Sequence, residues 1–422
     1  MLRRIPVSQL RAGMHVHELC GSWLDHPFWR TRFLIRDARD IARLVEGGVQ
    51  EVWIDASKGL DGEAPPSGTR ALVESPDESV PRRVDPPASR TFDAPGPDRV
   101  PMAVELERAS RICHKAREAV VSMFAEARMG RAIDASGALD LVEEIDESIA
   151  RNPVALVSIA RLKTADDYTF MHSVAVCGLM ISLGRQLGLD VAQVREAGLA
   201  GLLHDLGKAG VPTELLNKPG RLDAAEFAVM KRHPQLGHEM LLQAGTTGEI
   251  ALDVCLHHHE RMDGTGYPHR LDGPAISLYA RMGAVCDVYD AITSNRPYKA
   301  GWNPAESIRR MAGWAKGQFD ERVFHAFVKS VGIYPVGSLV RMSSGRLGVV
   351  IEQNEDALTT PKIKLFFSTR SDTRIQPEVI DLSRKGETDR IAGREDPARW
   401  DFRDLDSIWA GDSGPSPQPK PA

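Results

Sequence analysis

The sequence predicts a multidomain protein with a small α+β module at the N-terminus, an all-helical bundle in the middle and a small antiparallel β appendage near the C-terminus. Three observations predict this class. The chain has 422 residues, which is more than one hydrophobic core usually accommodates, so about two or three domains are expected. Nine prolines lie in residues 61–101 and separate the first module from the rest. Strand-like alternation is missing from about 134 to 331 and returns after Pro335.

Residues 1–60 form the predicted α+β module. The segments 14–19 and 51–55 alternate between apolar and polar residues as strands do, and 37–45 has the spacing of a helix. Neither an acidic phospho-acceptor pocket nor a nucleotide-binding loop is evident in this module. We therefore expect it to be regulatory or to form a dimer contact.

Two segments have compositions that cannot bury a core. Residues 61–101 combine their prolines with Gly, Ser, Asp and Arg, which is typical of an extended, mobile linker. Residues 411–422, with the sequence GDSGPSPQPKPA, are predicted to be a disordered tail. The remaining chain divides into a helical domain, residues 102–335, and a small β appendage with an irregular extension, residues 336–410.

Helical periodicity begins directly after the linker. Small and apolar residues recur there with alternating spacings of three and four, at Leu106, Ala109, Cys113, Ala116, Val120, Met123 and Ala127. This seam could belong to an intermolecular coiled coil or to a helix that packs on its own domain, and its length of about three heptads favours the second. Pairs typical of helix starts follow at Asp190 and Gln193, Asp223 and Glu226, and Asn303 and Pro304.

The β appendage is predicted from three runs of apolar and β-branched residues. These runs are 337–342, 347–353 and 362–368, and a Ser-Ser-Gly turn and a Thr-Thr-Pro break separate them. Such short runs with turn residues between them favour antiparallel strands.

Composition limits the classes of function. The net charge of −5 argues against a general binder of nucleic-acid polymers, because such proteins usually carry a basic excess. Five scattered cysteines without a CxxC pair fit a reducing cytoplasm and predict neither disulfides nor a zinc ribbon. No run approaches about 18 uninterrupted apolar residues, so we expect a cytoplasmic protein without membrane insertion.

The chemistry is concentrated in one part of the chain. Eight of the thirteen histidines lie between His172 and His269. The motifs there are HDLGK at 204–208, an isolated His233, HHHERMDGTGYP at 257–268 and DVYDAITSNRPYK at 287–299. Imidazoles and carboxylates without thiols suit iron, manganese or zinc better than magnesium or calcium. Basic residues in the same motifs could hold phosphate, so the sequence indicates a metal-dependent phosphohydrolase.

These motifs, in this order over about 150–335, resemble the HD-GYP branch of the HD metal-dependent phosphohydrolases, a family associated with hydrolysis of cyclic di-GMP. Residues 1–60 also resemble the small N-terminal domain that precedes some HD-GYP domains. The resemblance implies an HD-type helical bundle as the catalytic domain.

The resemblance also implies a set of metal ligands. They are His172, His204, Asp205, His233, His258, His259 and Asp287. Such a set can hold two divalent transition metal ions, iron or manganese, if Asp205 and a hydroxide bridge them. A third ion is less expected, because the residue four before His172 is Tyr168 and not a carboxylate. Asp290, one helical turn after Asp287, is expected to orient a ligand from behind.

Substrate contacts are expected on two sides of this centre. Lys208 is expected to act with Asp205 in catalysis, as a phosphate contact or a leaving-group neutraliser, although a helix-end lysine would be the structural alternative. The other expected substrate contacts are Gly266, Tyr267, Pro268, Arg296 and Lys299. The loop that carries Tyr267 is also a candidate surface for protein partners, and the RPYK segment could instead be an ordinary surface loop.

The main hypothesis is a cyclic di-GMP phosphodiesterase that releases linear pGpG, with GMP as an open second product. One alternative is an HD phosphohydrolase for another nucleotide, such as a hybrid cyclic dinucleotide. Another is a signalling adaptor that binds partners and hardly catalyses, but the complete ligand set argues against it. A homodimer is compatible with all three hypotheses.

Overall fold

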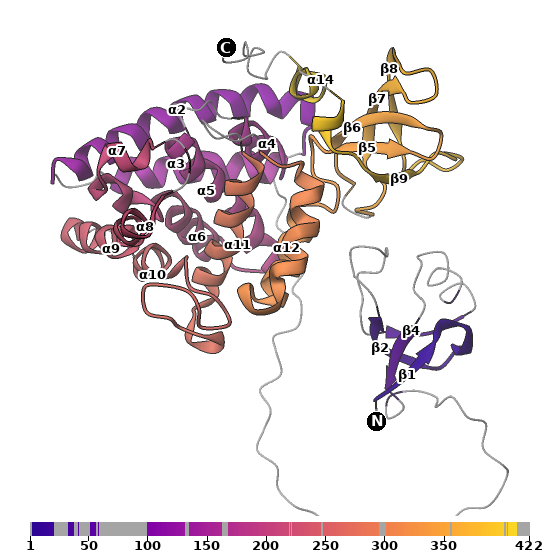
Figure 1. Ribbon diagram of the computed structural model, residues 1–422, viewed down its shortest axis with the longest axis horizontal. Coiled ribbons are helices and arrows are strands. Elements are labelled where there is room, and N and C mark those ends of the chain that lie inside the picture. The colour runs from indigo at the N-terminus through magenta and orange to yellow at the C-terminus, as the bar shows by residue number, and fades with distance from the viewer. Residues whose placement is uncertain are drawn as a thin grey trace, which may run out of the picture. The chain divides into compact units, whose positions relative to one another are not determined.

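The computed structural model of the protein contains two compact units, Met1–Phe92 and Asp93–Ala422 (Figure 1). The described residues are 2–20, 33–37, 41, 51–55, 58, 99–130, 135–162, 168–218, 220, 222–245, 248–294, 301–354, 357–400, 402 and 404–411. Most of the predicted linker and all but the first residue of the predicted tail lie outside them.

The N-terminal unit contains an antiparallel sheet with the strand order β1-β4-β2-β3. Its strands are β1 (Leu2–Pro6), β2 (His15–Cys20), β3 (Phe33–Leu34) and β4 (Glu51–Asp55). Ile5, Val16 and Ile54 are buried in its core. The strands predicted at 14–19 and 51–55 are confirmed, and β1 and β3 are additions. Apart from isolated positions, the helix predicted at 37–45 lies outside the described residues.

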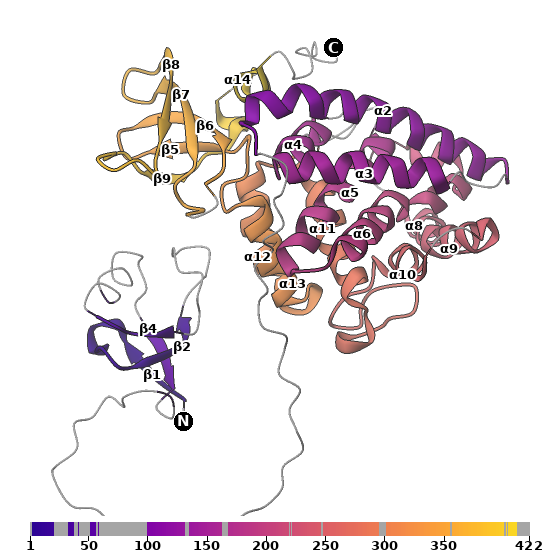
Figure 2. The same ribbon diagram turned by 180° about the vertical axis from the view of Figure 1, so that it is seen from behind.

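The second unit is built mainly from helices, as predicted (Figures 1 and 2). Its helical elements are α2 (Met102–Arg128), α3 (Ala135–Arg151), α4 (Ala155–Arg161), α5 (Tyr168–Leu187), α6 (Val191–Leu203), η2 (Leu206–Gly210), α7 (Thr213–Leu216), α8 (Ala224–Met230), α9 (His233–Ala244), α10 (Glu249–His257), η3 (Gly273–Ala275), α11 (Leu278–Thr293), α12 (Pro304–Gln318) and α13 (Glu321–Val331). The predicted starts of α6 and α8 are complete capping boxes, in which side chain and backbone satisfy each other's free groups. Asn303 caps α12, with Pro304 as its first residue.

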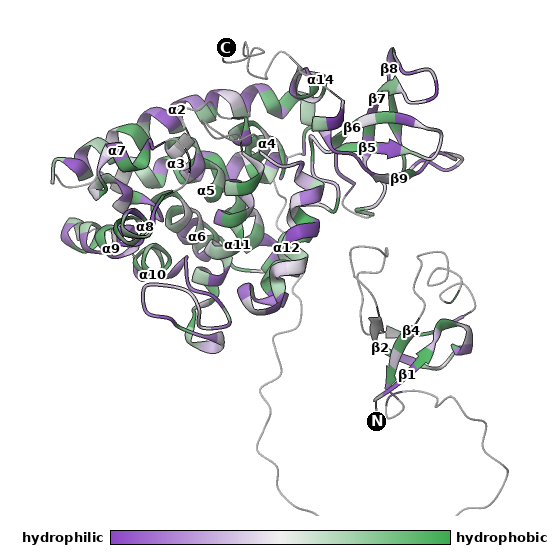
Figure 3. Ribbon diagram, viewed as in Figure 1, coloured by the Kyte–Doolittle hydropathy of each residue, from purple (hydrophilic) through white to green (hydrophobic). Residues whose placement is uncertain are grey.

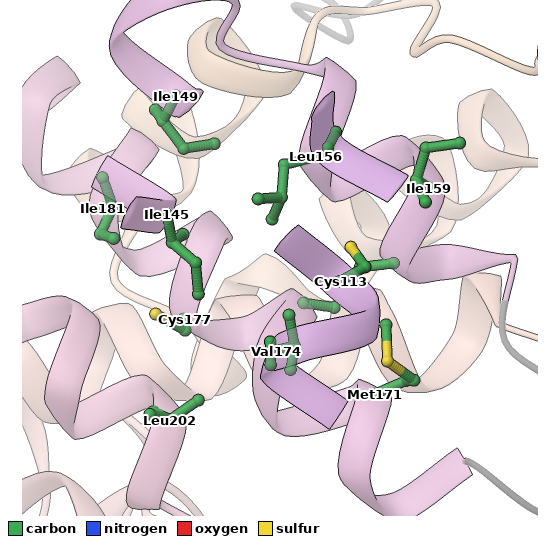
Figure 4. Packing of buried hydrophobic residues seen from close by; sticks show 14 of the residues in the cluster. Cys113, Ile145, Ile149, Leu156, Ile159, Met171, Val174, Cys177, Ile181 and Leu202 are labelled. Carbon is green, nitrogen blue, oxygen red and sulfur yellow. The ribbon is translucent and has the colours of Figure 1, made fainter. Parts of the chain in front are cut away.

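The heptad-like seam of α2 is buried inside this unit. All seven of its residues belong to the same core cluster as Leu156 and Val174. The helix lies beside α3 in both ribbon views (Figures 1 and 2). Cys113, Ile145 and Met171 belong to one core cluster and come from different helices (Figure 4). The seam therefore packs on its own domain, which was the explanation favoured by its short length.

The central helix α5 is apolar around most of its circumference, in line with its burial (Figure 3). Within it, Thr169–Leu187 is long and apolar enough to cross a membrane, but 78% of its most hydrophobic window is buried inside the unit. A helix enclosed by other helices shows the same composition without any lipid contact.

A five-stranded antiparallel sheet follows the helices, with the strand order β8-β7-β6-β5-β9. Its elements are β5 (Leu339–Met342), β6 (Arg346–Glu352), β7 (Lys362–Ser368), β8 (Thr373–Asp381) and β9 (Ile391–Arg394), and η4 (Pro397–Arg399) and α14 (Leu405–Ala410) follow. One face of the sheet, with Leu339 and Phe366, belongs to the helical core, and the other has its own cluster around Val350 and Ile363. The fold class predicted from the sequence is confirmed, and β8 and β9 are additions to the three strands predicted in this sheet.

Candidate metal centre

Seven imidazole and carboxylate side chains converge where several helices of the second unit begin or end. His172 and Asp287 are helical residues of α5 and α11, and His233 is the first residue of α9. His204 and His258 are the residues at which α6 and α10 end. The complete set, which matches the ligands expected from the sequence, is His172, His204, Asp205, His233, His258, His259 and Asp287. Helix ends suit this task, because a side chain there can turn inward without interrupting a helix.

Asp205 lies at the middle of the set. Its Oδ1 atom is 3.3 Å from His233 Nε2 and 3.9 Å from His258 Nε2. Its Oδ2 atom is 3.4 Å from the Nε2 atoms of both His172 and His204. One carboxylate thus faces two histidine groups, one with each oxygen.

The donors form overlapping groups around this carboxylate. One group is His233, His258 and His259, a second is His172, His204 and Asp287, and a third is His204, Asp205 and His258. Within each group the donor atoms lie within 4.8 Å of one another, which is the spacing that allows one small cation to contact all of them. The arrangement therefore offers two neighbouring positions that share Asp205.

Hydrogen bonds to the backbone orient the histidine rings. The Nδ1 atom of His204 is 2.7 Å from the carbonyl of Gly201, and that of His233 is 2.8 Å from the carbonyl of Met230. The Nδ1 atom of His258 is 3.0 Å from the carbonyl of Val254. A carbonyl can only accept, so these Nδ1 atoms carry the proton, and each Nε2 lone pair points into the centre.

A carboxylate performs the same task for His172. Its Nδ1 atom is 2.6 Å from Asp290 Oδ2, and its Nε2 atom is 3.1 Å from Asp287 Oδ1. Asp290 is almost fully buried and comes one turn after Asp287 on α11. It therefore lies behind His172 in the place expected from the sequence, where a carboxylate can fix the ring and raise its basicity.

The donor set fits metal ions better than it fits an ordinary buried polar cluster. Among the described residues, His204 Nε2 and Asp205 Oδ1 are buried atoms without a hydrogen-bond partner. Leaving such atoms unsatisfied is expensive, and native structures rarely do so without a reason. A divalent cation between these donors would satisfy both, and the chemistry of five imidazoles and two carboxylates suits a transition metal.

The surroundings of the centre shift the pKa values of several of these donors. Burial alone would raise the pKa of Asp205, but the combined effect of Lys208, His204 and His233 outweighs it and holds that pKa well below its ordinary value. Burial and neighbouring histidines lower the pKa of His258 strongly, and burial lowers the pKa of His259 to about 3. At neutral pH Asp205 is therefore ionised and His258 and His259 are neutral, which are the forms in which these groups bind metal.

Lys208 borders the centre from the short segment that follows α6. The chain leaves α6 at His204 and continues into the short helix η2, where the Lys208 ammonium group forms an ion pair with Asp205 Oδ2. The turn passes so close to α9 that a Cβ atom on Gly207 would lie 1.9 Å from the carbonyl oxygen of His233. A glycine is therefore required there.

The loop that follows α10 closes one side of the centre. The ring of Tyr267 stacks on that of His259, with centroids 4.7 Å apart and an angle of 28° between the planes. A Cβ atom on Gly266 would lie 2.5 Å from the backbone of Glu260 and Arg261, so this close approach also needs glycine. Gly266, Tyr267 and Pro268 all line a neighbouring cavity, where a bound substrate could reach them.

Glu260 is a functional candidate that the sequence reasoning did not assign. Its side chain is 2% exposed, and its two oxygens accept the backbone N–H groups of His269 and Leu271 at 2.7 and 3.1 Å. It therefore ties the loop to the end of α10. Its position directly after His258 and His259 was the available signal, but a glutamate in a polar motif looks like a surface residue until its burial is known.

Other candidates lie apart from the seven donors or outside the described residues. His257 Nε2 is 3.0 Å from His269 Nδ1, so these two histidines pair with each other rather than with the centre, in agreement with their omission from the predicted ligands. Arg296 and Lys299, the predicted phosphate contacts of the RPYK segment, lie outside the described residues. The side chains before His172 that bear on a third ion also lie outside them.

Comparison with known families assigns both parts of the chain. Residues 146–323 match the family described as HD domain, which covers the metal centre. Residues 2–138 match a domain of unknown function, DUF3391, a span that includes the N-terminal sheet and α2.

Individual relatives extend this result. Cyclic di-GMP phosphodiesterase PA4108 of Pseudomonas aeruginosa is 58% identical over 414 residues, covering 97% of this chain and 96% of that protein. The cyclic di-GMP phosphodiesterase response regulator RpfG of Xanthomonas campestris is 38% identical over 182 residues, 41% of this chain and 47% of RpfG. The 3′3′-cGAMP-specific phosphodiesterase 1 of Vibrio cholerae is 34% identical over 178 residues, 42% of this chain and 41% of that protein.

Proposed function

Since the chain belongs to the HD-GYP family of HD domain phosphohydrolases, we propose that it is a metal-dependent phosphodiesterase that opens cyclic di-GMP to linear pGpG. The observation that carries the proposal is the pair of neighbouring donor groups that share Asp205. A relative of nearly equal length that bears the name cyclic di-GMP phosphodiesterase supports the choice of substrate.

The seven donors would hold two metal ions, with Asp205 contributing one oxygen to each position. Such a pair of ions supplies charge neutralisation at the phosphodiester and water activated near neutral pH. The chain itself contributes the rigid placement of the donors. Backbone carbonyls and Asp290 fix the histidine rings, so little reorganisation is needed when ligands bind.

Lys208 places a cation directly at the centre. Its ammonium group contacts the same Asp205 oxygen that faces His172 and His204. We assign it the task of meeting a non-bridging phosphate oxygen or the oxygen that leaves, where negative charge develops. Gly266, Tyr267 and Pro268 would contact the nucleotide from the loop after α10, and Arg296 and Lys299 remain predicted phosphate contacts.

A hybrid cyclic dinucleotide is the second candidate substrate. Relatives from Vibrio cholerae that are named 3′3′-cGAMP-specific phosphodiesterases share 34% and 41% identity with this chain over their matched regions. The metal donors do not read the bases, so both molecules would meet the same centre. Competition between cyclic di-GMP and 3′3′-cGAMP in one assay would rank them.

Several finer assignments belong to the same proposal. Iron or manganese is the expected metal, with GMP as an open further product and the cytoplasm as the location. The helical segment 102–335 would carry catalysis, with 336–410 as a small β appendage and extension. Residues 1–60 would regulate catalysis or form a homodimer, with 61–101 as linker and 411–422 as tail. The loop with Tyr267 would be available to protein partners.

The test is a product assay with defined metal content. Protein purified without oxygen is analysed for metals, loaded with iron or manganese, and incubated with cyclic di-GMP. Linear pGpG should appear, and a chelator should abolish its formation. Absence of product from fully loaded protein would refute the proposal, whereas faster turnover of 3′3′-cGAMP in the competition would favour the second substrate.

A further inference from the structure

A cationic cavity lies directly beside the candidate metal centre. Its volume is about 600 Å³, and its ten lining residues come from α8, the two-residue connection to α9, α9 itself and the loop after α10. Tyr267 is shared by both places, since it lines the cavity and stacks on His259. Arg232 also lines the cavity and directly precedes His233 in the chain. A ligand seated at the centre could therefore extend into this cavity without leaving the protein surface.

The wall of the cavity carries positive charge without local compensation. Lys231, Arg232 and Arg270 all line it and are exposed, and none of its ten lining residues is acidic. Among the described residues, none of the three cations forms an ion pair with a carboxylate. The Lys231 ammonium group instead lies over two aromatic rings, 4.8 Å from the centre of Phe227 and 5.2 Å from that of Tyr267. In a chain with a net charge of −5, such a group of free cations favours an anionic ligand.

The backbone of Arg270 is held in an unusual conformation. Its φ angle is 57°, which places a non-glycine residue in the left-handed region. Glu260 accepts hydrogen bonds from the backbone N–H groups of His269 and Leu271, the two residues that flank Arg270. A buried carboxylate thus fixes both flanking peptides, and Arg270 lines the cavity as a result. Residues kept in sparsely populated conformations cluster at sites that clamp ligands.

The chemistry of the substrate supplies the matching anion. A cyclic dinucleotide contains two phosphodiesters in one ring, each with a negative charge, and only one of them can occupy the metal centre at a time. The second phosphodiester and its nucleoside must lie outside the centre. A cavity of about 600 Å³ is within the usual range for a small-molecule site and has room for that half of the molecule.

We propose that Arg270, with Arg232 and Lys231, binds the phosphodiester of the cyclic dinucleotide that is not being cleaved. This inference rests on the proposed function and adds a subsite to it. Glu260 is a positioning residue in this scheme, because it sets the backbone from which the Arg270 side chain extends. Guanidinium groups suit the task, since they can donate two parallel hydrogen bonds to one phosphate.

The test compares two substrates in the metal-loaded full-length protein. Cyclic di-GMP has the second phosphodiester, and bis(p-nitrophenyl) phosphate does not. The ratio of kcat/KM for the first substrate to that for the second should fall about tenfold in Arg270→Gln, mainly through KM for cyclic di-GMP. Arg232→Gln and Lys231→Met should lower the same ratio, and Arg270→Lys should restore part of it because the charge is kept.

A matched control is Arg322→Gln, which removes an exposed arginine on α13 that does not line the cavity. Its ratio should equal that of the wild type. Circular dichroism melting curves separate a binding defect from a folding defect. The KM for cyclic di-GMP should also depend less on salt in the Arg270→Gln, Arg232→Gln, Lys231→Met triple variant than in the wild type.

The outcomes distinguish this subsite from the function on which it rests. If the wild type hydrolyses cyclic di-GMP and the ratio is unchanged in the triple variant, the subsite is wrong and the proposed function stands. If the wild type hydrolyses only bis(p-nitrophenyl) phosphate, the proposed substrate is wrong and the subsite is overturned with it.

Discussion

Two of the buried groups of charged side chains in the helical unit differ in their hydrogen bonding. In the first, Glu105 of α2 is fully buried, and it accepts hydrogen bonds from Ser148 at 2.8 Å and from Arg151 Nε and Nη2 at 3.0 Å each. In the second, the metal centre, His204 Nε2 and Asp205 Oδ1 have no hydrogen-bond partner among the described residues. The first group joins α2 to α3 and is satisfied within itself. The second also joins helices, since His172 of α5 pairs with Asp290 of α11, but it leaves these two atoms without a partner in the described part of the chain.

The difference separates a structural site from a functional one. A buried charge is tolerated when its partners satisfy it, and then its removal should affect stability. A set of donors that remains unsatisfied in the protein alone is prepared for a ligand from outside, and its removal should affect chemistry. Burial and charge are common to both groups, so neither property alone identifies the active site.

The largest expected effect tests the functional half of this comparison. Asp205→Asn keeps the shape of the side chain but removes the charge that faces both histidine groups. We expect turnover of cyclic di-GMP to fall on the order of a thousandfold or more, because both metal positions lose a shared anionic ligand. Kinetics and metal analysis on the same preparation would measure this.

As a control, circular dichroism checks that this variant is folded. A folded Asp205→Asn protein that keeps both metal and activity would contradict the assignment of Asp205 as the shared ligand. It would also remove the contrast with Glu105, since neither group would then be chemically essential.

The second effect tests the structural half. Glu105→Ala leaves Arg151 with only 18% of its side chain exposed and without its main partner. We expect the free energy of unfolding to fall by about 3 kcal/mol, because a buried charge pair is broken on one side. Chemical denaturation would measure the loss, and the kcat of the remaining folded protein should match the wild type.

Glu105→Gln is the matched variant, since it retains oxygen for Ser148 and one contact to Arg151. Its loss should be smaller than that of Glu105→Ala. If Glu105→Ala instead lowered kcat without a change in stability, the division into a structural and a functional group would be wrong.

A third, smaller effect concerns the residue behind the ligands. Asp290→Asn keeps a group that can accept a hydrogen bond from His172 Nδ1 but removes its charge. We expect metal affinity to fall about 10-fold to 100-fold, as is usual when such an outer partner is changed. Titration of metal-free protein with manganese would show it, and an unchanged affinity would mean that Asp290 only fills space.

The metal centre could be predicted from the sequence more fully than its surroundings. HDLGK, the adjacent histidines and DVYD contain five of the seven donors that the fold brings together, and the family resemblance added His172 and His233. Glu260 and Arg270 gave no such signal, because the burial of one and the left-handed backbone of the other arise only when the loop closes on α10. The satisfied cluster at Glu105 was hidden for the same reason, since Ser148 and Arg151 lie more than forty residues further along the chain.

The fold elements differ in the same way, because some depend on residues close in the sequence and others on distant partners. Capping boxes at Asp190 and Asp223 act within four residues, so the sequence alone identified them. Strand β8 is mostly exposed along its length and has little apolar alternation, and it forms because β7 offers a free edge. Local interactions could therefore be predicted from the sequence, whereas elements that depend on a partner far along the chain could not.

The smallest expected effect is a difference in acid stability that originates in the metal centre. Burial lowers the pKa of His259 to about 3, whereas a histidine in the unfolded chain titrates near its ordinary value of about 6.5. Between these two values the unfolded state binds a proton that the folded state does not, so the free energy of unfolding falls as the pH is lowered. With 24% of this side chain exposed, His259 should contribute about 1 kcal/mol to the loss between about pH 7.5 and 5.5.

His259→Gln should therefore lose about 1 kcal/mol less than the wild type over this range, measured by denaturation in the presence of a chelator. The chelator matters because bound metal would add its own dependence on pH. The pKa of His172 is raised, because Asp287 and Asp290 outweigh its burial, so protonation of His172 stabilises the folded state as the pH falls. This contribution is present in both the wild type and His259→Gln, and it therefore cancels in the comparison. Equal losses of stability in the two proteins would show that His259 can be protonated in the folded state at little cost. The side chains of the centre would then satisfy one another as those around Glu105 do, and the contrast between the two groups would be weaker.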